Sequence, residues 1–160
     1  MSDEMAWVRI EQEFDAPIDM VWQMWADPTL FARWYGPKGF TVPVAEMDVV
    51  KGGTRKICMQ MQTPDKTMTM WFIGVYTEVS EPVRLAYTES MCDAAGNIIP
   101  PSAMGMPDGH PETTEVIVEL NEANGKTMMV MTHKGVPAGT AGEGGWRQAI
   151  DKLAALVAAA

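Results

Sequence analysis

The sequence is poor in cysteine and histidine. Its 160 residues include two histidines and two cysteines, Cys58 and Cys92. The cysteines lack the C-x-x-C spacing of zinc and redox sites, and two are too few for the disulfide framework of a small secreted protein. We therefore expect a protein of a reducing compartment, the cytoplasm.

Positive charge is also scarce. Lys and Arg total 12 against 21 Asp and Glu, giving a formal net charge of −9, and the basic residues are scattered. Nucleic acids and anionic lipid surfaces are bound by clustered Lys and Arg, so we expect neither as a partner. No run reaches the ~20 apolar residues of a membrane-spanning helix, and Met1 to Glu4 lacks the basic start of a signal peptide.

The motifs of several enzyme classes are missing. The sequence has no Gly-rich phosphate loop, no G-x-S-x-G elbow and no H-E-x-x-H. The sequence therefore lacks the motifs that kinases, dehydrogenases, hydrolases and metalloproteases of these classes need for their active sites. We expect neither a cofactor nor a metal ion. The length suits one core, and no repeat or linker divides the chain, so we predict a single domain over residues 1–160.

Hydrophobic periodicity predicts an α+β fold. A half-buried strand at Trp7–Phe14 is followed by a helix with Pro17 at its first position, and by a second short helix with Asp27 as N-cap. The Asn124-Gly125 pair predicts a tight hairpin turn that needs positive φ. Period-two patterns predict six more strands, near 40–49, 54–62, 67–79, 83–90, 113–120 and 126–133.

The last segment predicts an amphipathic helix over Trp146–Val157. Its apolar residues recur at helical spacing, with Arg147 and Lys152 among the residues on the opposite face. Gly144 and Gly145 precede it and would let the helix start close to the sheet or to a bound ligand.

Several short motifs follow one another along the chain: Ala16 to Trp22, Trp34, Gly52-Gly53, Gly74 to Val79, Pro82 to Leu85 and Gly145-Trp146. In this order they resemble the motifs of a known family. The chain resembles, from about residue 8 to 157, the bacterial family related to the activator of the ninety-kilodalton heat-shock protein ATPase, within the START-like (SRPBCC; polyketide-cyclase and birch-pollen-allergen-like) superfamily. The resemblance implies a helix-grip fold, in which a curved antiparallel sheet of about seven strands wraps around a long C-terminal helix and encloses a cavity.

Methionine is the residue type in excess, with 15 in the chain, many at alternate strand positions. Flexible, polarizable Met side chains can adapt to an apolar ligand, but they can equally fill a core. We predict that a small hydrophobic ligand, lipid-like or polyketide-like, is bound between the helix and the strands. The predicted binding residues are Trp34, Arg55, Ile57, Met59, Met61, Met70, Phe72, Tyr76, Tyr87, Met129, Met131, His133, Trp146, Ile150 and Leu153.

The strand at 67–79 is apolar on both faces. We expect Met68, Met70, Phe72 and Tyr76 to point inward, with Trp71 and its neighbours outward. An outward Trp71 would need a covering surface, which a homodimer would supply.

Polar groups on the inward faces are candidates for chemistry. His133, in phase with Met131, would lie beside Tyr or Arg groups and can serve as an acid or base, or it can be a structural histidine at the rim. Arg55 can orient a ligand oxygen, or it can form a structural ion pair with an acid such as Glu89. Tyr76 and Tyr87 can offer hydroxyls to a ligand or only pack.

The stretch from Met91 to Pro111 is longer than the hairpin connection that the resemblance implies. It is rich in Pro, Met and Ile, and we predict a lid over the mouth of the pocket, with a disordered loop as the alternative. Cys92, Asp108 and His110 fall within it, but their spacing matches no established ligand pattern, so we predict no zinc site.

Three functions remain open from the sequence. Binding of a small hydrophobic molecule is the first. A polyketide-cyclase-like enzyme would need His133, Arg55 and a tyrosine to converge on one point. The family resemblance implies a third, a co-chaperone-like interaction module that contacts a chaperone through its outer surface.

Overall fold

The computed structural model describes residues 7–104 and 111–159. Its seven strands and three α-helices follow the order that the sequence predicts. The elements are β1 (Trp7–Phe14), α1 (Ile18–Ala26), α2 (Pro28–Phe31), β2 (Thr41–Met47), β3 (Thr54–Gln62), β4 (Thr67–Ser80), β5 (Arg84–Cys92), the 3-10 helix η1 (Pro101–Met104), β6 (Thr113–Ala123), β7 (Lys126–Pro137) and α3 (Ala141–Ala158).

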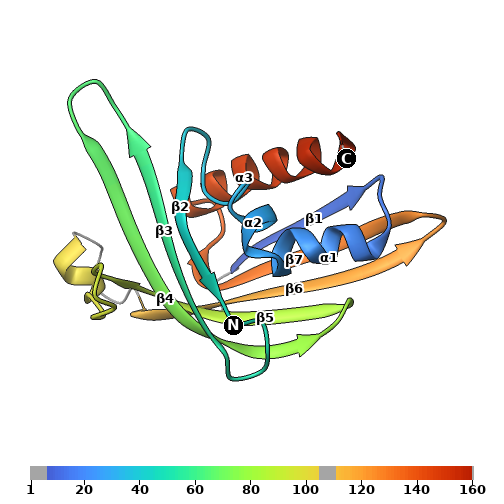
Figure 1. Cartoon of the computed structure of the whole chain (residues 1–160), viewed down its shortest axis with the longest axis horizontal. Helices are drawn as coiled ribbons and strands as arrows, with labels where there is room; N and C mark the ends of the chain where they lie inside the picture. The colour runs from blue at the N-terminus through green and yellow to red at the C-terminus, as the bar shows by residue number, and fades with distance from the viewer. Residues whose placement is uncertain (1–6, 105–110, 160) are drawn as a thin grey trace, which may run out of the picture.

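The strands form one antiparallel sheet in the order β1-β7-β6-β5-β4-β3-β2. Consecutive strands from β2 to β7 are neighbours, and β1 closes the sheet by pairing with β7. The sheet curves strongly, and the helices lie within the curve on one side of it (Figure 1). This is the α+β helix-grip architecture that the resemblance implies.

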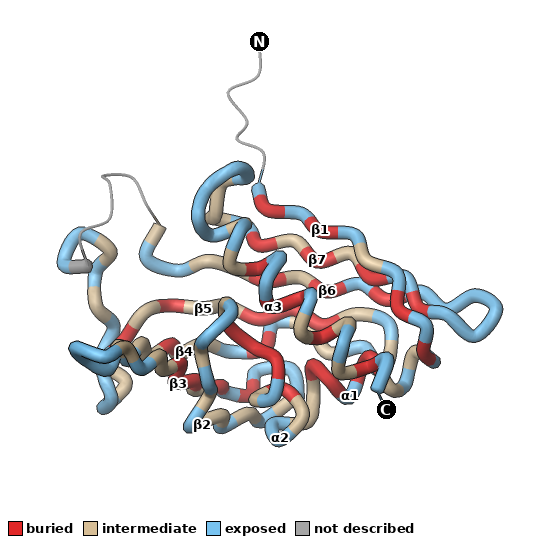
Figure 2. Tube along the Cα trace, turned by 90° about the horizontal axis from the view of Figure 1, so that it is seen from above, coloured by how far each residue is buried: buried red, intermediate tan, exposed pale blue. Residues whose placement is uncertain are grey.

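The core lies between this face of the sheet and the helices. Helix α3 packs on β1, β7 and α1, while α1 also packs on β6 and β7. Val8, Ile10 and Phe14 of β1 are buried at alternate positions, and Leu153 of α3 is fully buried. In Figure 2, buried positions alternate with exposed ones along β1, β7 and β6, as expected for a sheet covered on one face.

The predicted turns and caps are confirmed. Asp27 caps α2, because its Oδ1 accepts hydrogen bonds from the backbone N–H groups of Thr29 at 2.8 Å and Leu30 at 3.2 Å. Asn124 and Gly125 form the two-residue turn between β6 and β7, with φ of 57° and 77°. Both values lie in the left-handed region that Asn and Gly tolerate.

Several predicted boundaries were wrong, at the strand ends as well as at the helices. Helix α3 begins at Ala141 rather than Trp146, so Gly144 and Gly145 lie inside it. Strand β7 continues past His133 to Pro137 because its end pairs with Trp7 of β1. Pro17 is the N-cap of α1 and not its first residue. Each error extends or shifts an element at its end, where long-range packing outweighs local propensity.

The two faces of β4 are oriented as predicted. Phe72 and Tyr76 are buried beneath the helices, whereas Val75 is exposed on the opposite face. Trp71 on that outer face is partly covered by Lys56, whose Nζ lies 5.1 Å from the ring centroid and donates to the Ala94 carbonyl oxygen at 2.5 Å. A homodimer over the outer face stays a prediction.

Candidate functional site

Two adjoining cavities open at the N-terminal end of α3, and we call them together the crevice. The smaller, about 160 Å³, lies between the start of α3, the segment after α2 and Met59 of β3. The larger, about 490 Å³, lies between the start of α3, the strands β4 to β7 and the segment after β5. Glu89, Ala141 and Gly142 border both cavities.

The lining of the crevice is mostly apolar. The smaller cavity is bordered by Tyr35, Gly36, Pro37, Met59, Glu89, Ala141, Gly142, Gly145, Trp146 and Ala149. The larger is bordered by Phe72, Glu89, Met91, Ile99, Pro101, Pro111, Glu112, Thr114, His133, Val136, Pro137, Thr140, Ala141 and Gly142.

Glycine lets the first turns of α3 approach their neighbours closely. A Cβ on Gly142 would lie 2.6 Å from Cγ1 of Val136, and a Cβ on Gly145 would lie 3.1 Å from Cγ of Pro37. The first of these distances is too short for any side chain without a local shift. The sequence Ala-Gly-Glu-Gly-Gly thus positions the helix end against β7 and the segment after α2.

An aromatic cluster supports the inner wall of the smaller cavity. The Trp146 ring stacks on Trp25 at 6.2 Å between centroids and meets Tyr35 edge to face at 5.5 Å. Trp34 packs against Trp25 and donates its indole N–H to the Met24 carbonyl oxygen at 2.8 Å. Trp146 is therefore both a core residue, 9% exposed, and part of the cavity wall.

His133 links α3 to two strands of the sheet. Trp146 donates its indole N–H to Nδ1 of His133 at 2.8 Å, and Nε2 lies 2.7 Å from Oγ1 of Thr114. Because Nδ1 accepts a hydrogen bond, the neutral ring carries its proton on Nε2 and donates to Thr114. The Thr114 hydroxyl lies 3.4 Å from the backbone carbonyl oxygen of Glu89, to which it donates.

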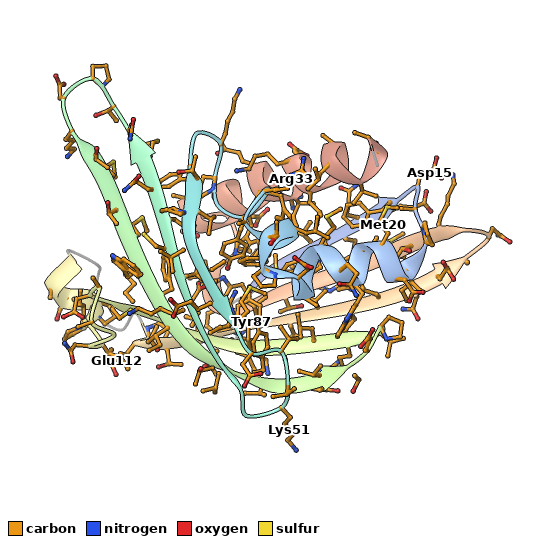
Figure 3. All side chains as sticks on the ribbon, viewed as in Figure 1. Asp15, Met20, Arg33, Lys51, Tyr87 and Glu112 are labelled. Carbon is orange, nitrogen blue, oxygen red and sulfur yellow. The ribbon has the colours of Figure 1, made fainter. Side chains whose placement is uncertain are left out.

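Arg55 is buried among aromatic rings. Its guanidinium carbon lies 3.6 Å from the Tyr87 ring centroid, and its Nε donates to the Tyr76 hydroxyl at 3.4 Å. Its register partner on β4 is Gly74, where a Cβ would lie 1.8 Å from the backbone carbonyl oxygen of Thr88 on β5. Figure 3 labels Tyr87 on the helix side of the sheet.

Glu89 completes this polar cluster. Nη1 of Arg55, a residue 1% exposed, lies 3.5 Å from Oε2 of Glu89, whose side chain is 11% exposed. The Tyr35 hydroxyl donates to the same oxygen at 3.1 Å and also lies 3.1 Å from the Tyr87 hydroxyl. The ion pair that the sequence offered as the structural role of Arg55 is therefore present.

The phenols of this cluster stay protonated over a wide pH range. Burial, followed by the charge of Glu89, raises the pKa of Tyr35 well above its ordinary value. Burial also raises the pKa of Tyr87. Both groups therefore act as neutral hydrogen-bond donors beside Glu89.

Four of the predicted binding residues border the crevice. Met59 and Trp146 line the smaller cavity, and Phe72 and His133 line the larger. Met61 and Met70 are partly buried, and Met70 borders another cavity, of about 300 Å³, beside Trp71. The other nine lie in the packed interior: Trp34, Arg55, Ile57, Tyr76, Tyr87, Met129, Met131, Ile150 and Leu153.

Two of the methionines predicted to bind the ligand are packed core residues. Met129 and Met131 are fully buried beneath α3, which is the alternative that the sequence left open. The crevice lies instead at the beginning of α3, and Met59 and Met91 are the methionines among its described lining residues.

Several lining residues were missed from the sequence. Tyr35, Gly36 and Pro37 follow α2, and their approach to α3 is a long-range contact that hydrophobic periodicity does not show. The residues that α3 contributes could have been found from the sequence. Ala141, Gly145 and Ala149 repeat every four residues, so they extend the face of Trp146 toward the N-terminus of the helix.

The segment after β5 contributes to the larger cavity. Ile99, Pro101 and Pro111 border it. The predicted lid includes residues 105–110, which lie outside the described residues. Asp108 and His110 lie outside them as well.

These two residues and Cys92 are the group for which the sequence predicts no zinc site. Among residues 7–104 and 111–159, no group of three or more His, Cys, Asp or Glu is placed to hold a metal ion. Within the same residues, no helix is long and apolar enough to cross a membrane.

Comparison with solved structures agrees with this fold. A protein from Nitrosomonas europaea shares 20% identity at a TM-score of 0.73, over 98% of this chain and 96% of its own. One from Arthrobacter aurescens shares 25% identity at a TM-score of 0.73, over 95% and 86%. The AHSA1 protein from Silicibacter pomeroyi shares 21% at a TM-score of 0.72, over 96% and 98%. A search of curated proteins finds no match.

The curved seven-stranded sheet with its long C-terminal helix is the fold of the START-like, helix-grip class. The chain belongs to the family described as Activator of Hsp90 ATPase homolog 1-like protein, whose sequence profile matches residues 15–158.

Proposed function

We propose that this protein binds a small hydrophobic molecule in the crevice at the N-terminal end of α3. The observation that carries the proposal is the larger cavity, whose volume of about 490 Å³ lies within the range of small-molecule sites, roughly 300–1,000 Å³. Its lining is apolar with a few polar groups, as such sites commonly are. Binding of hydrophobic molecules is also what the START-like resemblance implies.

Both walls of the crevice are held by contacts that need no ligand. Trp146 is fixed by its hydrogen bond to His133 and by its stacking on Trp25. Glu89 is fixed by Arg55 and Tyr35. Walls held in this way favour binding, because less conformational entropy is lost when the ligand enters.

The proposed site lies nearer the beginning of α3 than the one predicted from the sequence. Ile150 and Leu153 are packed against the sheet, so the middle of α3 serves the core. Ligand contacts are assigned instead to the first turns of α3 and to the segments that face them. Trp146 stands at the boundary between these two parts of the helix.

The proposal is tested by filling the crevice from its exposed side. Ala141 is exposed and borders both cavities, so Ala141→Phe places a ring in the crevice without disturbing the core. Titration with the neutral fluorescent probe Nile red should show binding to the unmodified protein and affinity reduced about tenfold or more in Ala141→Phe.

Ala155→Phe is the matched control. Ala155 is an exposed residue of the same helix and is not among the residues that border the crevice. It should retain Nile red affinity, and both variants should keep the melting temperature. Equal affinity in the two variants, or no binding by the unmodified protein, contradicts the proposal.

A further inference from the structure

We propose that the crevice selects hydrophobic molecules that carry a protonated amine, with the Glu89 carboxylate as the acceptor for the ammonium group. This inference rests on the proposed function and names the chemical class of its ligand. It follows from the charges and the hydrogen-bonding groups that border the two cavities.

The ionisable lining groups are unbalanced in sign. Among the described residues that border the crevice, Glu89 and Glu112 are the acids, none is Lys or Arg, and the basic residue His133 accepts a hydrogen bond from Trp146 at Nδ1. Glu89 borders both cavities, whereas Glu112 is exposed beside the segment that follows β5 (Figure 3). A cation in the crevice would therefore meet carboxylates, and an anion would meet no side-chain ammonium or guanidinium group among these residues.

Arg55 balances the charge of Glu89 from behind the carboxylate but does not itself border the crevice. Its guanidinium stacks on Tyr87 and is 1% exposed, and the residue is not among those that border the crevice. It contacts Glu89 at Oε2, the oxygen that also accepts from Tyr35. Arg55 and Tyr35 thus orient the carboxylate, which remains at the border of both cavities.

The side-chain polar hydrogens of the described residues that border the crevice already have acceptors, whereas Nη2 of Arg55, behind Glu89, has none. The Trp146 indole N–H is donated to His133, the Tyr35 hydroxyl lies against Glu89 and Tyr87, and the Thr114 hydroxyl lies against the Glu89 carbonyl oxygen. A ligand therefore finds acceptors rather than donors among these side chains. Hydrogen bonds between an ammonium group and a carboxylate are the stronger, charge-assisted kind.

The positive end of the α3 dipole would favour an anion, but a side chain of the helix complements it. Glu143 lies in the first turn of α3. Its Oε1 accepts from the backbone N–H of Gly139 at 3.1 Å, and its Oε2 accepts from Nε of Arg147 at 2.8 Å. A carboxylate in the first turn is a favourable partner for this end of the dipole.

The experiment compares three ligands with the same apolar chain. Octylammonium, octanol and octanoate are titrated at pH 7 against the protein loaded with Nile red. Octylammonium should displace the probe at a concentration about tenfold lower than octanol, the ratio that corresponds to one charge-assisted hydrogen bond. Octanoate should be weaker than octanol.

The outcomes separate this inference from the proposed function. Displacement by octanol with no advantage for octylammonium, or with octanoate the strongest, overturns the amine preference and leaves hydrophobic binding intact. Failure of all three ligands to displace the probe overturns both.

Two variants assign the preference to Glu89. The double variant Arg55→Met, Glu89→Gln removes the carboxylate without leaving a buried unpaired cation and without changing the net charge. In this double variant the ratio of octylammonium affinity to octanol affinity should fall from about tenfold to about one. Arg55→Met alone keeps the carboxylate and should keep the advantage, with circular dichroism confirming that both variants fold. An advantage that persists in the double variant overturns the assignment to Glu89.

Discussion

Trp146 donates its indole N–H to Nδ1 of His133, so a side-chain hydrogen bond ties α3 to β7 where the crevice begins. The bond joins the walls of the two cavities, because Trp146 borders the smaller and His133 the larger. A change in the Trp146–His133 pair should therefore alter both the packing of α3 on β7 and the shape of the crevice.

Replacing Trp146 should separate these two roles. Trp146→Phe keeps an aromatic ring but leaves Nδ1 of buried His133 without this donor, and should lower the free energy of unfolding by about 1–3 kcal/mol. Trp146→Ala also opens a cavity and should cost about 3–5 kcal/mol. Urea unfolding measures both. If the Trp146→Phe variant is as stable as the unmodified protein, the hydrogen bond contributes nothing to stability.

Trp146→Ala should also weaken Nile red binding more than it reduces the helical circular dichroism signal. Equal losses of binding and of helical signal would mean that Trp146 serves only the core.

The Arg55–Glu89 pair predicts strong coupling between two substitutions. Glu89→Gln leaves the buried guanidinium without its carboxylate and should cost about 3–5 kcal/mol in urea unfolding. The double variant Arg55→Met, Glu89→Gln should cost less than the sum of the single changes. Costs that simply add would show that the two side chains act independently.

An exposed ion pair provides the contrast. Arg84 pairs with Glu78 and Glu119 at 2.6 Å, but its side chain is 37% exposed. Arg84→Gln should therefore cost no more than about 1 kcal/mol. A larger loss would mean that burial does not explain the difference between the two pairs.

The tyrosines predict a loss of stability at high pH. The chain has three, and burial raises the pKa of each, Tyr35, Tyr76 and Tyr87, above the ordinary value of 10.0. A raised folded-state pKa means that the unfolded chain releases its phenolic protons first. The stability contributed by the neutral phenols is therefore complete below pH 10 and is lost as the pH rises above it.

Phenolate absorbance measures this directly. Titration of the folded protein should show all three tyrosines ionising above pH 10, whereas the urea-unfolded chain should titrate near 10. Each buried phenol should remove about 1.4 kcal/mol of stability per pH unit between its two pKa values. A folded protein whose tyrosines titrate like those of the unfolded chain would contradict the burial of this cluster.

Two glycines of α3 predict opposite responses to the same substitution. Gly144→Ala adds a Cβ with nothing within 4 Å and should stabilise the helix, by about 0.5–1 kcal/mol. Gly142→Ala gains the same helix propensity but places its Cβ 2.6 Å from Cγ1 of Val136. It should be less stable than Gly144→Ala in thermal unfolding, and equal stability would show that the helix end is free to shift away from β7.

The order of strands and helices could be predicted because apolar residues recur every second position in the strands and every three to four positions in the helices. The alternation in β1 and the stripe from Trp146 to Val157 both correspond to buried positions. The first turn of α3 could not be predicted in this way, because Ala-Gly-Glu-Gly-Gly has low helix propensity. The packing of Gly142 and Gly145 against Val136 and Pro37 compensates for that low propensity.

The position of the crevice was harder to predict than the fold. Alternation showed that Met129 and Met131 point inward, but it could not show whether an inward residue meets a cavity or another side chain. That depends on long-range packing, such as the approach of Pro37 to Gly145. The partner of Arg55 could be anticipated, since a buried cation requires a nearby carboxylate.

The position of the ligand is tested most directly by nuclear magnetic resonance of the labelled protein during titration with octanol. The largest backbone amide shifts should fall at residues that border the crevice, including Glu89, Thr114, Ala141 and Gly142. Largest shifts around Trp71 on the outer face, or no saturable shifts at all, would contradict a ligand site at the N-terminal end of α3.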